Sequence, residues 1–118
     1  MCGIVGVVGP WSKPLLSAMI SSLAHRGPDS SGAVFEAEAG IAIGHTRLAI
    51  IDLTDDAAQP MTSANGRYVL TYNGEIYNFL DLRRELAASG ETFTSNSDTE
   101  VLLRLFALYG LDLSLIHI

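Results

Sequence analysis

CGIVGVVG, residues 2–9, is a glycine-rich apolar run that is followed directly by Pro10. A short run of this kind, bounded by a proline, is typical of a buried β-strand. The strand begins almost at the first residue, so Cys2 stands at its amino end. The sequence therefore predicts a buried strand with the thiol of Cys2 at its end.

A helix and two strands are expected to follow this first strand. Ser12 can cap the helix, which ends at the turn-forming residues 25–30. One face of the helix carries apolar residues at helical spacing, namely Leu15, Leu16, Met19, Ile20 and Leu23. The strand-like segments 32–36 and 41–51 flank a turn near Gly40, which predicts a hairpin.

The second half of the chain is expected to add a loop, a strand and two helices. Residues 52–66 are rich in polar residues and proline, which indicates a loop, and residues 67–72 favour a strand. One helix is expected from Asn78 to Gly90. Another is expected from Ser97 to Gly110, because Ser97 and Glu100 have the spacing of a capping box. This order predicts a layered α+β domain.

Composition narrows the class of protein. The 118 residues fit one small domain, and 48% of them are hydrophobic, which is enough for a core. A net charge of −6 leaves no basic surface for phosphates, so nucleic acid and membrane surfaces are not expected partners. No stretch approaches the roughly 20 apolar residues of a membrane span. One cysteine cannot form an internal disulfide, which favours a cytoplasmic protein.

Cys2 has two interpretations. Free cysteine is commonly a small buried hydrophobe, and this location alone does not exclude that role. If Met1 is removed, however, an α-amine becomes available on the carbon that carries the thiol. That amine could take the thiol proton and later pass a proton to a leaving amine, so Cys2 is a candidate nucleophile with a built-in base.

The Asn73–Gly74 pair also has two interpretations. Asn-Gly between β-prone runs is the strongest short signal for a hairpin turn, so the pair could simply be a turn. Alternatively, the side-chain amide of Asn73 and the backbone N–H of Gly74 could converge on one point and stabilise a developing oxyanion.

Arg47 and Asp98 are candidates for binding charged groups. Arg47 lies in the strand-like run HTRLAII, where its guanidinium either reaches water at a strand edge or grips a carboxylate with two hydrogen bonds. Asp98 lies in SDTE, where it either complements a helix dipole or binds an ammonium group.

Two kinds of site are not indicated. His25, His45 and His117 lack metal-ligand spacing and have no second cysteine to join them, so structural roles are expected and no metal site is predicted. The glycines of residues 2–9 do not have dinucleotide-binding spacing, and no phosphate-loop lysine follows them.

Taken together, the motifs resemble the glutaminase domain of glutamine-hydrolysing asparagine synthetases, which is a class II amidotransferase domain. The matching blocks are MCGIVG at 1–6, HRGPD at 25–29, GHTRLAIIDL at 44–53, QPM at 59–61, NGEIYNF at 73–79 and SDTE at 97–100. Other class II amidotransferases share the N-terminal cysteine, a strand that carries an arginine, and an Asn-Gly pair. The amino-acid sequences of the blocks in this chain, however, resemble the asparagine synthetase branch.

The resemblance implies a fold and a role for each site residue. The fold would be the four-layer αββα sandwich of N-terminal-nucleophile hydrolases, incomplete at the C-terminus. Cys2 would attack the side-chain amide of glutamine, and Asn73 and Gly74 would form the oxyanion hole. Residues that would bind the substrate are Arg47, Leu48 and Ile51 at its carboxylate, and Glu75 and Asp98 at its ammonium group.

The resemblance also implies partners. Residues 1–112 would form a partial glutaminase domain, whereas residues 113–118, LSLIHI, are expected to be a tail outside the family pattern. A synthetase domain, expected to be absent from this chain, would use ATP and Mg²⁺ to amidate aspartate with the released ammonia. The glutaminase part itself is expected to need no cofactor, and the complete parent is expected to form a homodimer. The isolated fragment is expected to be weakly active or inactive.

Two other functions remain open at this level. The chain could be a class II glutaminase that serves a different acceptor, or a non-catalytic domain that binds glutamine or a partner protein. The presence of Cys2, Arg47, Asn73, Gly74 and Asp98 together favours a catalytic glutaminase.

Overall fold

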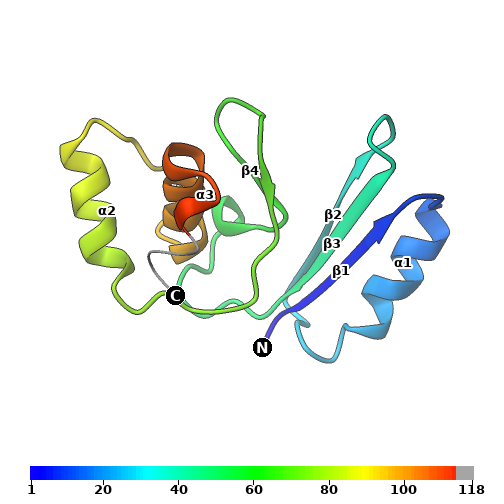
Figure 1. Cartoon of the computed structure of the whole chain (residues 1–118). Helices are drawn as coiled ribbons and strands as arrows, with labels where there is room; N and C mark the ends of the chain where they lie inside the picture. Colours follow the sequence, from blue (N-terminus) through cyan, green and yellow to red (C-terminus); the bar gives the residue numbers. More distant parts are fainter. Residues whose placement is uncertain (114–118) are drawn as a thin grey trace.

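The computed structural model describes residues 1–113, which form a mixed α/β domain with two small antiparallel sheets. The elements in chain order are β1 (Gly3–Val8), α1 (Lys13–Ser22), β2 (Ser30–Glu36), β3 (Ile41–Arg47), the 3-10 helix η1 (Asp55–Ala57), β4 (Met61–Thr62), β5 (Val69–Leu70), α2 (Phe79–Ala88) and α3 (Asp98–Tyr109). Helix α1 lies on one side of the larger sheet, and α2 and α3 lie on the other side, beyond β4 (Figure 1).

The larger sheet has the strand order β1-β3-β2, so β3 is its central strand. The predicted hairpin is confirmed, because β2 pairs with β3 from Ser30 opposite Arg47 to Glu36 opposite Ile41. The first strand pairs with the other edge of β3, from Gly3 opposite Thr46 to Val8 opposite Ile41. Both pairings end where β3 ends, so the amino end of β1 lies beside the carboxyl end of β3.

Helix α1 packs on one face of this sheet. Ser12 caps the helix as predicted, since its Oγ accepts a hydrogen bond from the Leu15 backbone nitrogen at 3.2 Å. Leu16 is fully buried at the interface. A methyl group on Gly44 of β3 would lie 2.6 Å from Cδ1 of Ile20, so the absence of a side chain there allows the helix to approach the sheet closely.

The other face of the sheet carries the loop that leads into β4. On β2, a methyl group on Gly32 would collide with the backbone carbonyl of Gln59. His45 points to the same face, and its Nδ1 lies 2.9 Å from Oγ1 of Thr71, just after β5. Glycine at position 32 therefore lets the β4–β5 region lie directly against the sheet.

Helices α2 and α3 share a separate core with the chain that follows them. Its buried members are Leu86, Val101, Leu105 and Leu113. Ser97 caps α3 as predicted, because its Oγ accepts from the Glu100 nitrogen at 3.2 Å. The reciprocal half of the capping box is wrong: the Glu100 carboxylate accepts instead from the nitrogens of Thr94 at 3.0 Å and Ser95 at 2.7 Å. Burial alone would raise the pKa of Glu100. The hydrogen bond from the Ser95 hydroxyl, the two backbone hydrogen bonds and the nearby Arg104 charge outweigh burial and lower that pKa.

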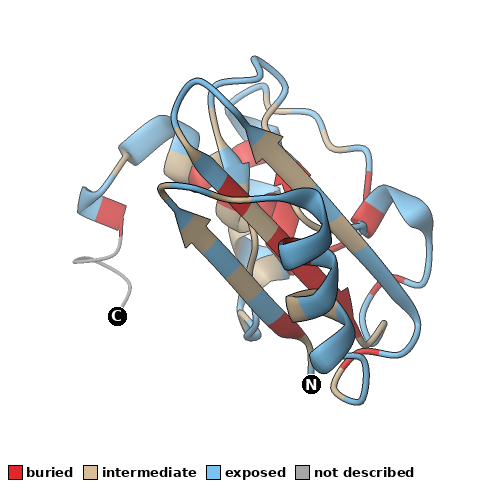
Figure 2. Ribbon diagram, turned by 90° about the vertical axis from the view of Figure 1, so that its right-hand side faces the viewer, coloured by how far each residue is buried: buried red, intermediate tan, exposed pale blue. Residues whose placement is uncertain are grey.

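Several predicted features are wrong in detail. The first strand is not buried: β1 is an edge strand in which Ile4 is 47% and Val8 is 82% exposed. Exposed and intermediate residues alternate along it after Gly3 (Figure 2). The strand predicted at 41–51 ends at Arg47, where its pairing partners end. The strand predicted at 67–72 shrinks to β5, and the loop predicted at 52–66 contains η1 and β4.

Candidate active site

The thiol of Cys2 lies against the end of β3. Its Sγ accepts a hydrogen bond from the Leu48 nitrogen at 3.4 Å and lies 3.7 Å from the Leu48 carbonyl oxygen. The Cys2 carbonyl oxygen in turn accepts from Nε of Arg26 at 3.1 Å. The pairing of Gly3 with Thr46 aligns the two strands and so brings Cys2 to this point.

The turn before β2 supports the same corner of the fold. A methyl group on Gly27 would lie 2.5 Å from the Arg47 nitrogen, so only glycine lets this turn lie against β3. Asp29 donates from its backbone nitrogen to the Arg47 carbonyl at 3.0 Å. Its carboxylate accepts from the Ala49 nitrogen at 2.8 Å. The HRGPD block therefore fixes the backbone around Arg47. No role for this block could be predicted from the sequence.

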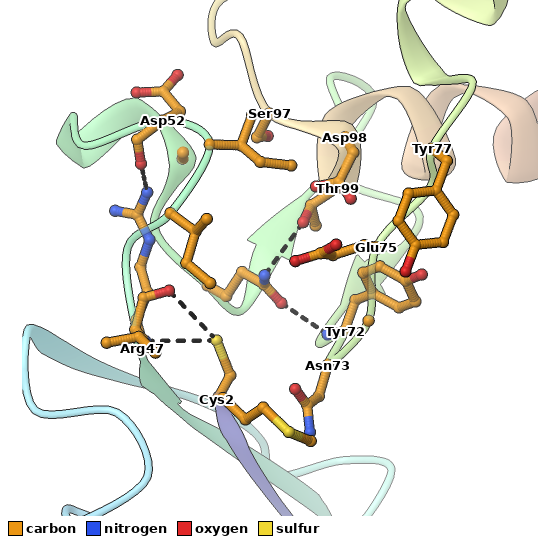
Figure 3. A pocket seen from close by; sticks show the side chains of 17 residues that line it. Cys2, Arg47, Asp52, Tyr72, Asn73, Glu75, Tyr77, Ser97, Asp98 and Thr99 are labelled. Carbon is orange, nitrogen blue, oxygen red and sulfur yellow. Dashed lines mark hydrogen bonds between the residues drawn. The ribbon is translucent and has the colours of Figure 1, made fainter.

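Arg47 is only 8% exposed, and its guanidinium is held by two backbone carbonyls. Nη1 donates to the Thr54 oxygen at 2.9 Å. Nη2 donates to the Asp52 oxygen (Figure 3). Arg47 is thus oriented within the structure, and the interpretation that it reaches water from a strand edge is wrong, because β3 is the central strand. A guanidinium carries five N–H donors, so further donors remain for a ligand.

Asp52 connects this corner to the start of α3. One carboxylate oxygen accepts from both Thr54 Oγ1 at 2.7 Å and the Thr54 nitrogen at 2.8 Å. The other accepts from the Asn96 nitrogen at 2.7 Å, directly before the cap of α3. These hydrogen bonds lower the pKa of Asp52 to about 2, and the bond from the Thr54 side chain has the largest effect. Because its oxygens are occupied, Asp52 is a structural acid. The sequence did not single it out, and its place in the GHTRLAIIDL block was the available signal.

Asp98 opens α3 and is 5% exposed. Its Oδ2 accepts from the Ile76 nitrogen at 3.0 Å, which ties the helix start to the segment before α2. It does stand in the first helical turn, as the helix-dipole interpretation requires. Its carboxylate also borders the cleft described below, so position alone leaves both interpretations in place.

The Asn73–Gly74 pair is not a hairpin turn. It follows β5 and leads toward α2, whereas the turn that joins β4 to β5 lies at residues 63–68. Neither residue has a positive φ, which a tight Asn-Gly hairpin turn requires. The turn interpretation is therefore wrong. Both residues instead border the cleft, where Asn73 lies across from Cys2 (Figure 3).

A cleft of about 370 Å³ lies between these segments, except the turn before β2, which does not line it. Its lining includes every residue that the sequence predicted for the site: Cys2, Arg47, Leu48, Ile51, Asn73, Gly74, Glu75 and Asp98. The cleft thus offers a thiol, a cation and two carboxylates to one small ligand. Such a combination of charges suits a zwitterionic amino acid.

The lining also contains residues that the sequence did not single out. Tyr72 is one of them and directly precedes Asn73. The pKa of its hydroxyl is raised, mainly by burial and to a smaller extent by the negative charges of Asp98 and Glu75. Gln59 and Thr99 complete one wall. Gln59 lies in the QPM block and Thr99 in the SDTE block. Their presence in motifs shared with the family was the one sequence feature that could have pointed to them as site residues.

His25 and His45 lie apart from this lining. His45 is 1% exposed. Its pKa is lowered to about 4, mainly by burial and to a smaller extent by the nearby positive charge of Arg47. His117 lies outside the described residues. Within residues 1–113, no cluster of three His, Cys, Asp or Glu side chains could hold a metal ion. Over the same residues, the longest apolar helix falls short of the length needed to cross a bilayer.

Comparison with known proteins defines the class to which this site belongs. The family model for the glutamine amidotransferase domain matches residues 1–116, so the chain belongs to that family.

Relatives within the class carry a more specific name. Glutamine-hydrolysing asparagine synthetases 1 and 3 of Bacillus subtilis strain 168 are 40% and 43% identical to the chain, over 92% and 87% of it respectively. A probable glutamine-hydrolysing asparagine synthetase of Schizosaccharomyces pombe is 40% identical over 93% of the chain. The matches cover 18%, 17% and 20% of these relatives, so the chain spans about a fifth of their length.

Proposed function

We propose that this chain is the glutaminase part of a glutamine-hydrolysing asparagine synthetase. Cys2 hydrolyses glutamine to glutamate and ammonia, and a synthetase domain uses the ammonia to amidate aspartate. The observation that carries the proposal is the convergence of Cys2, Arg47, Asn73 and Asp98 on one cleft from four separate parts of the chain. Family membership and the names of the relatives support the choice of substrate.

The proposed binding mode follows from the charges in the cleft. Arg47 holds the α-carboxylate of glutamine with the N–H groups that Asp52 and Thr54 leave free, assisted by the backbone from Leu48 to Ile51. Glu75 and Asp98 hold the α-ammonium group. This orientation extends the side-chain amide of glutamine toward the thiol of Cys2.

In the proposed chemistry, removal of Met1 exposes the α-amine of Cys2, which takes the thiol proton. The sulfur attacks the amide carbon, and the Asn73 amide and Gly74 N–H stabilise the negative oxygen that develops. The C–N bond then breaks, ammonia leaves with the proton from the amine, and a γ-glutamyl thioester remains. Water, deprotonated by the same amine, cleaves the thioester to glutamate and restores the thiol.

The wider context is part of the same proposal. The fold would be a four-layer αββα sandwich, which is supported by α1 on one side of the larger sheet and α2 and α3 beyond β4 (Figure 1). The synthetase domain would use ATP and Mg²⁺ to activate aspartate, and the parent would act as a homodimer. A reducing cytoplasm would keep the single thiol of Cys2 active.

The direct test replaces Cys2 in the full-length protein. Cys2→Ala should abolish glutamate release and glutamine-dependent asparagine synthesis, while synthesis from added ammonia continues and serves as the internal control for folding. Glutamine hydrolysis by Cys2→Ala at the wild-type rate would show that Cys2 is not the nucleophile. A wild-type protein that hydrolyses glutamine but makes no asparagine from ATP, aspartate and ammonia would show that the acceptor is wrong.

A further inference from the structure

The segment that carries Asn73 and Gly74 has little structure of its own. Residues 71–78 lie between β5 and α2 and contain no strand or regular helix. Within the part of the chain described, three side chains from distant segments hold this one by hydrogen bonds. They are His45 at Thr71, Gln59 at the Tyr72 nitrogen and Asp98 at the Ile76 nitrogen. The last two bracket residues 73–75, so they determine where this short stretch stands in the cleft.

Gln59 makes its contact with both ends of one amide group. Its Oε1 accepts from the Tyr72 nitrogen at 2.6 Å, and its Nε2 donates to Oγ1 of Thr99 at 3.1 Å, as the dashed lines to Tyr72 and Thr99 show (Figure 3). A backbone N–H can only donate, so the oxygen of the amide must face Tyr72 and its nitrogen must face Thr99. The geometry therefore leaves one orientation for this side chain.

The two partners of Gln59 are neighbours of the proposed site residues. Tyr72 directly precedes Asn73, and Thr99 directly follows Asp98. Thr99 is 4% exposed in the first turn of α3, which is anchored by its own core. The Gln59 amide thus links a loosely structured segment to a rigid helix across one wall of the cleft.

The backbone of Gln59 is itself fixed. Its carbonyl oxygen lies directly over Gly32 of β2, in space that any side chain at position 32 would occupy. Met61, two residues later, is 9% exposed and pairs with Leu70 in the smaller sheet. Gln59 therefore has the support that a positioning residue needs, because a mobile residue could not fix another segment.

We propose that Gln59 is a positioning residue for glutamine hydrolysis, which sets the place of Asn73 and Gly74 relative to Cys2 and Asp98. This role rests on the proposed function. An oxyanion hole acts only when its donors stand about 2.7 to 3.1 Å from the developing charge. A displacement of about 1 Å at a reacting centre can cost on the order of 100-fold in rate. Loss of the Gln59 amide should therefore affect the transition state more than the binding of glutamine.

The first test is Gln59→Leu in the full-length protein, which keeps the approximate volume and removes both hydrogen bonds. We expect kcat for glutamine hydrolysis to fall by about 10- to 100-fold, with a change in KM below about fivefold. Hydrogen exchange at the Tyr72 amide should accelerate, which reports the lost contact independently of activity. Ammonia-dependent synthesis should be unchanged.

A second pair of variants tests the link to α3 from its other end. Thr99→Val removes the hydroxyl that accepts from Gln59 and should lower kcat by about 3- to 10-fold, because the bond to Tyr72 remains. Thr99→Ser keeps a hydroxyl and should stay within about twofold of wild type. The double variant Gln59→Leu with Thr99→Val should be no slower than Gln59→Leu alone, since both changes break one connection.

Asn65→Ala is the matched control for a structural effect. Like Gln59, the Asn65 side chain makes two hydrogen bonds, but it accepts both and lies in the turn between β4 and β5. The donors are Ser63 Oγ at 2.7 Å and the Arg67 nitrogen at 3.0 Å. It should lower the melting temperature without lowering kcat. A folded Gln59→Leu with wild-type kcat, or one no slower than Asn65→Ala, overturns the role of Gln59 alone. A wild-type protein without Cys2-dependent glutamine hydrolysis overturns both this role and the proposed function.

Discussion

The sulfur of Cys2 lies 3.4 Å from the backbone nitrogen of Leu48, the residue that follows Arg47. One strand end therefore positions both the proposed nucleophile and the proposed carboxylate clamp. The Cys2 carbonyl is held as well, by Nε of Arg26 at 3.1 Å. The thiol and the carbonyl of Cys2 are both held in place. The proposed base is its α-amine, which is free only if Met1 has been removed.

We predict that retention of Met1, or acetylation of the Cys2 amine after Met1 is removed, nearly abolishes glutamine hydrolysis. Either change turns the amine into an amide, which cannot take the thiol proton. Intact mass spectrometry and glutaminase rate should be measured on the same full-length sample, with ammonia-dependent synthesis as the folding control. Full glutaminase activity in a sample whose mass includes Met1 would contradict the role of the amine.

Arg47→Lys should mainly raise KM for glutamine. Lysine keeps the positive charge but cannot donate to the Thr54 and Asp52 carbonyls and to a carboxylate in the same planar geometry. The expected loss of binding is about 1.5 to 3 kcal/mol. Steady-state kinetics and melting temperature should be measured together, with Arg67→Lys on the exposed β4–β5 turn as the matched control. An unchanged KM in Arg47→Lys would rule out the carboxylate clamp.

Local sequence patterns predicted the elements that depend on neighbouring residues. The caps at Ser12 and Ser97 and the hairpin at Gly40 are local features, and the structure has all three. The burial of β1 was predicted wrongly because its apolar composition does not reveal its place in the sheet. Strand order alone makes β1 an edge and leaves Val8 exposed.

The candidate site shows the same division between local and distant information. Shared motifs pointed to Cys2, Arg47 and Asp98, and the structure brings all three to one cleft. Asp52 was missed because its role depends on the Asn96 nitrogen, which is 44 residues away in the chain. Contacts of that kind arise only from tertiary packing, so no periodicity or local spacing can indicate them.

His45 should make the domain less stable in mild acid. Its pKa is lowered from 6.5 to about 4, so the folded state favours the neutral ring. As the pH falls from 6.5 toward 4, the unfolded state takes up a proton that the folded state does not. The free energy of unfolding therefore decreases over this range, by about 3 kcal/mol in total. Hydrogen exchange of β3 amides in the full-length protein, corrected for intrinsic rates, should show the loss. His45→Asn, which cannot titrate but can still reach Thr71, should remove most of it. An identical pH dependence in both proteins would contradict the assignment.

Gly32→Ala should destabilise the domain by about 1 to 3 kcal/mol, because the new methyl group would collide with the carbonyl of Gln59. Gly6→Ala on β1 is the matched control, since a methyl group there meets only Cγ2 of Ile43 at 3.9 Å. That change should be neutral or slightly stabilising. Melting temperatures of the two variants give the comparison, and equal values would show that the loop does not pack against β2.

Asn73→Ala should lower kcat by roughly 10² to 10³ while KM changes little, because the Asn73 amide is proposed to bind the oxygen only as negative charge develops on it. The structure removes the competing explanation, since Asn73 and Gly74 lack the positive φ of a hairpin turn and do not connect two strands. A residue that served only the turn would affect stability instead of rate. Glutamine hydrolysis and melting temperature should be measured on Asn73→Ala and on Asn65→Ala, which removes an amide from the actual turn between β4 and β5. The first variant should lose rate without stability, and the second should lose stability without rate. A well-folded Asn73→Ala protein with wild-type kcat would exclude Asn73 from the oxyanion hole.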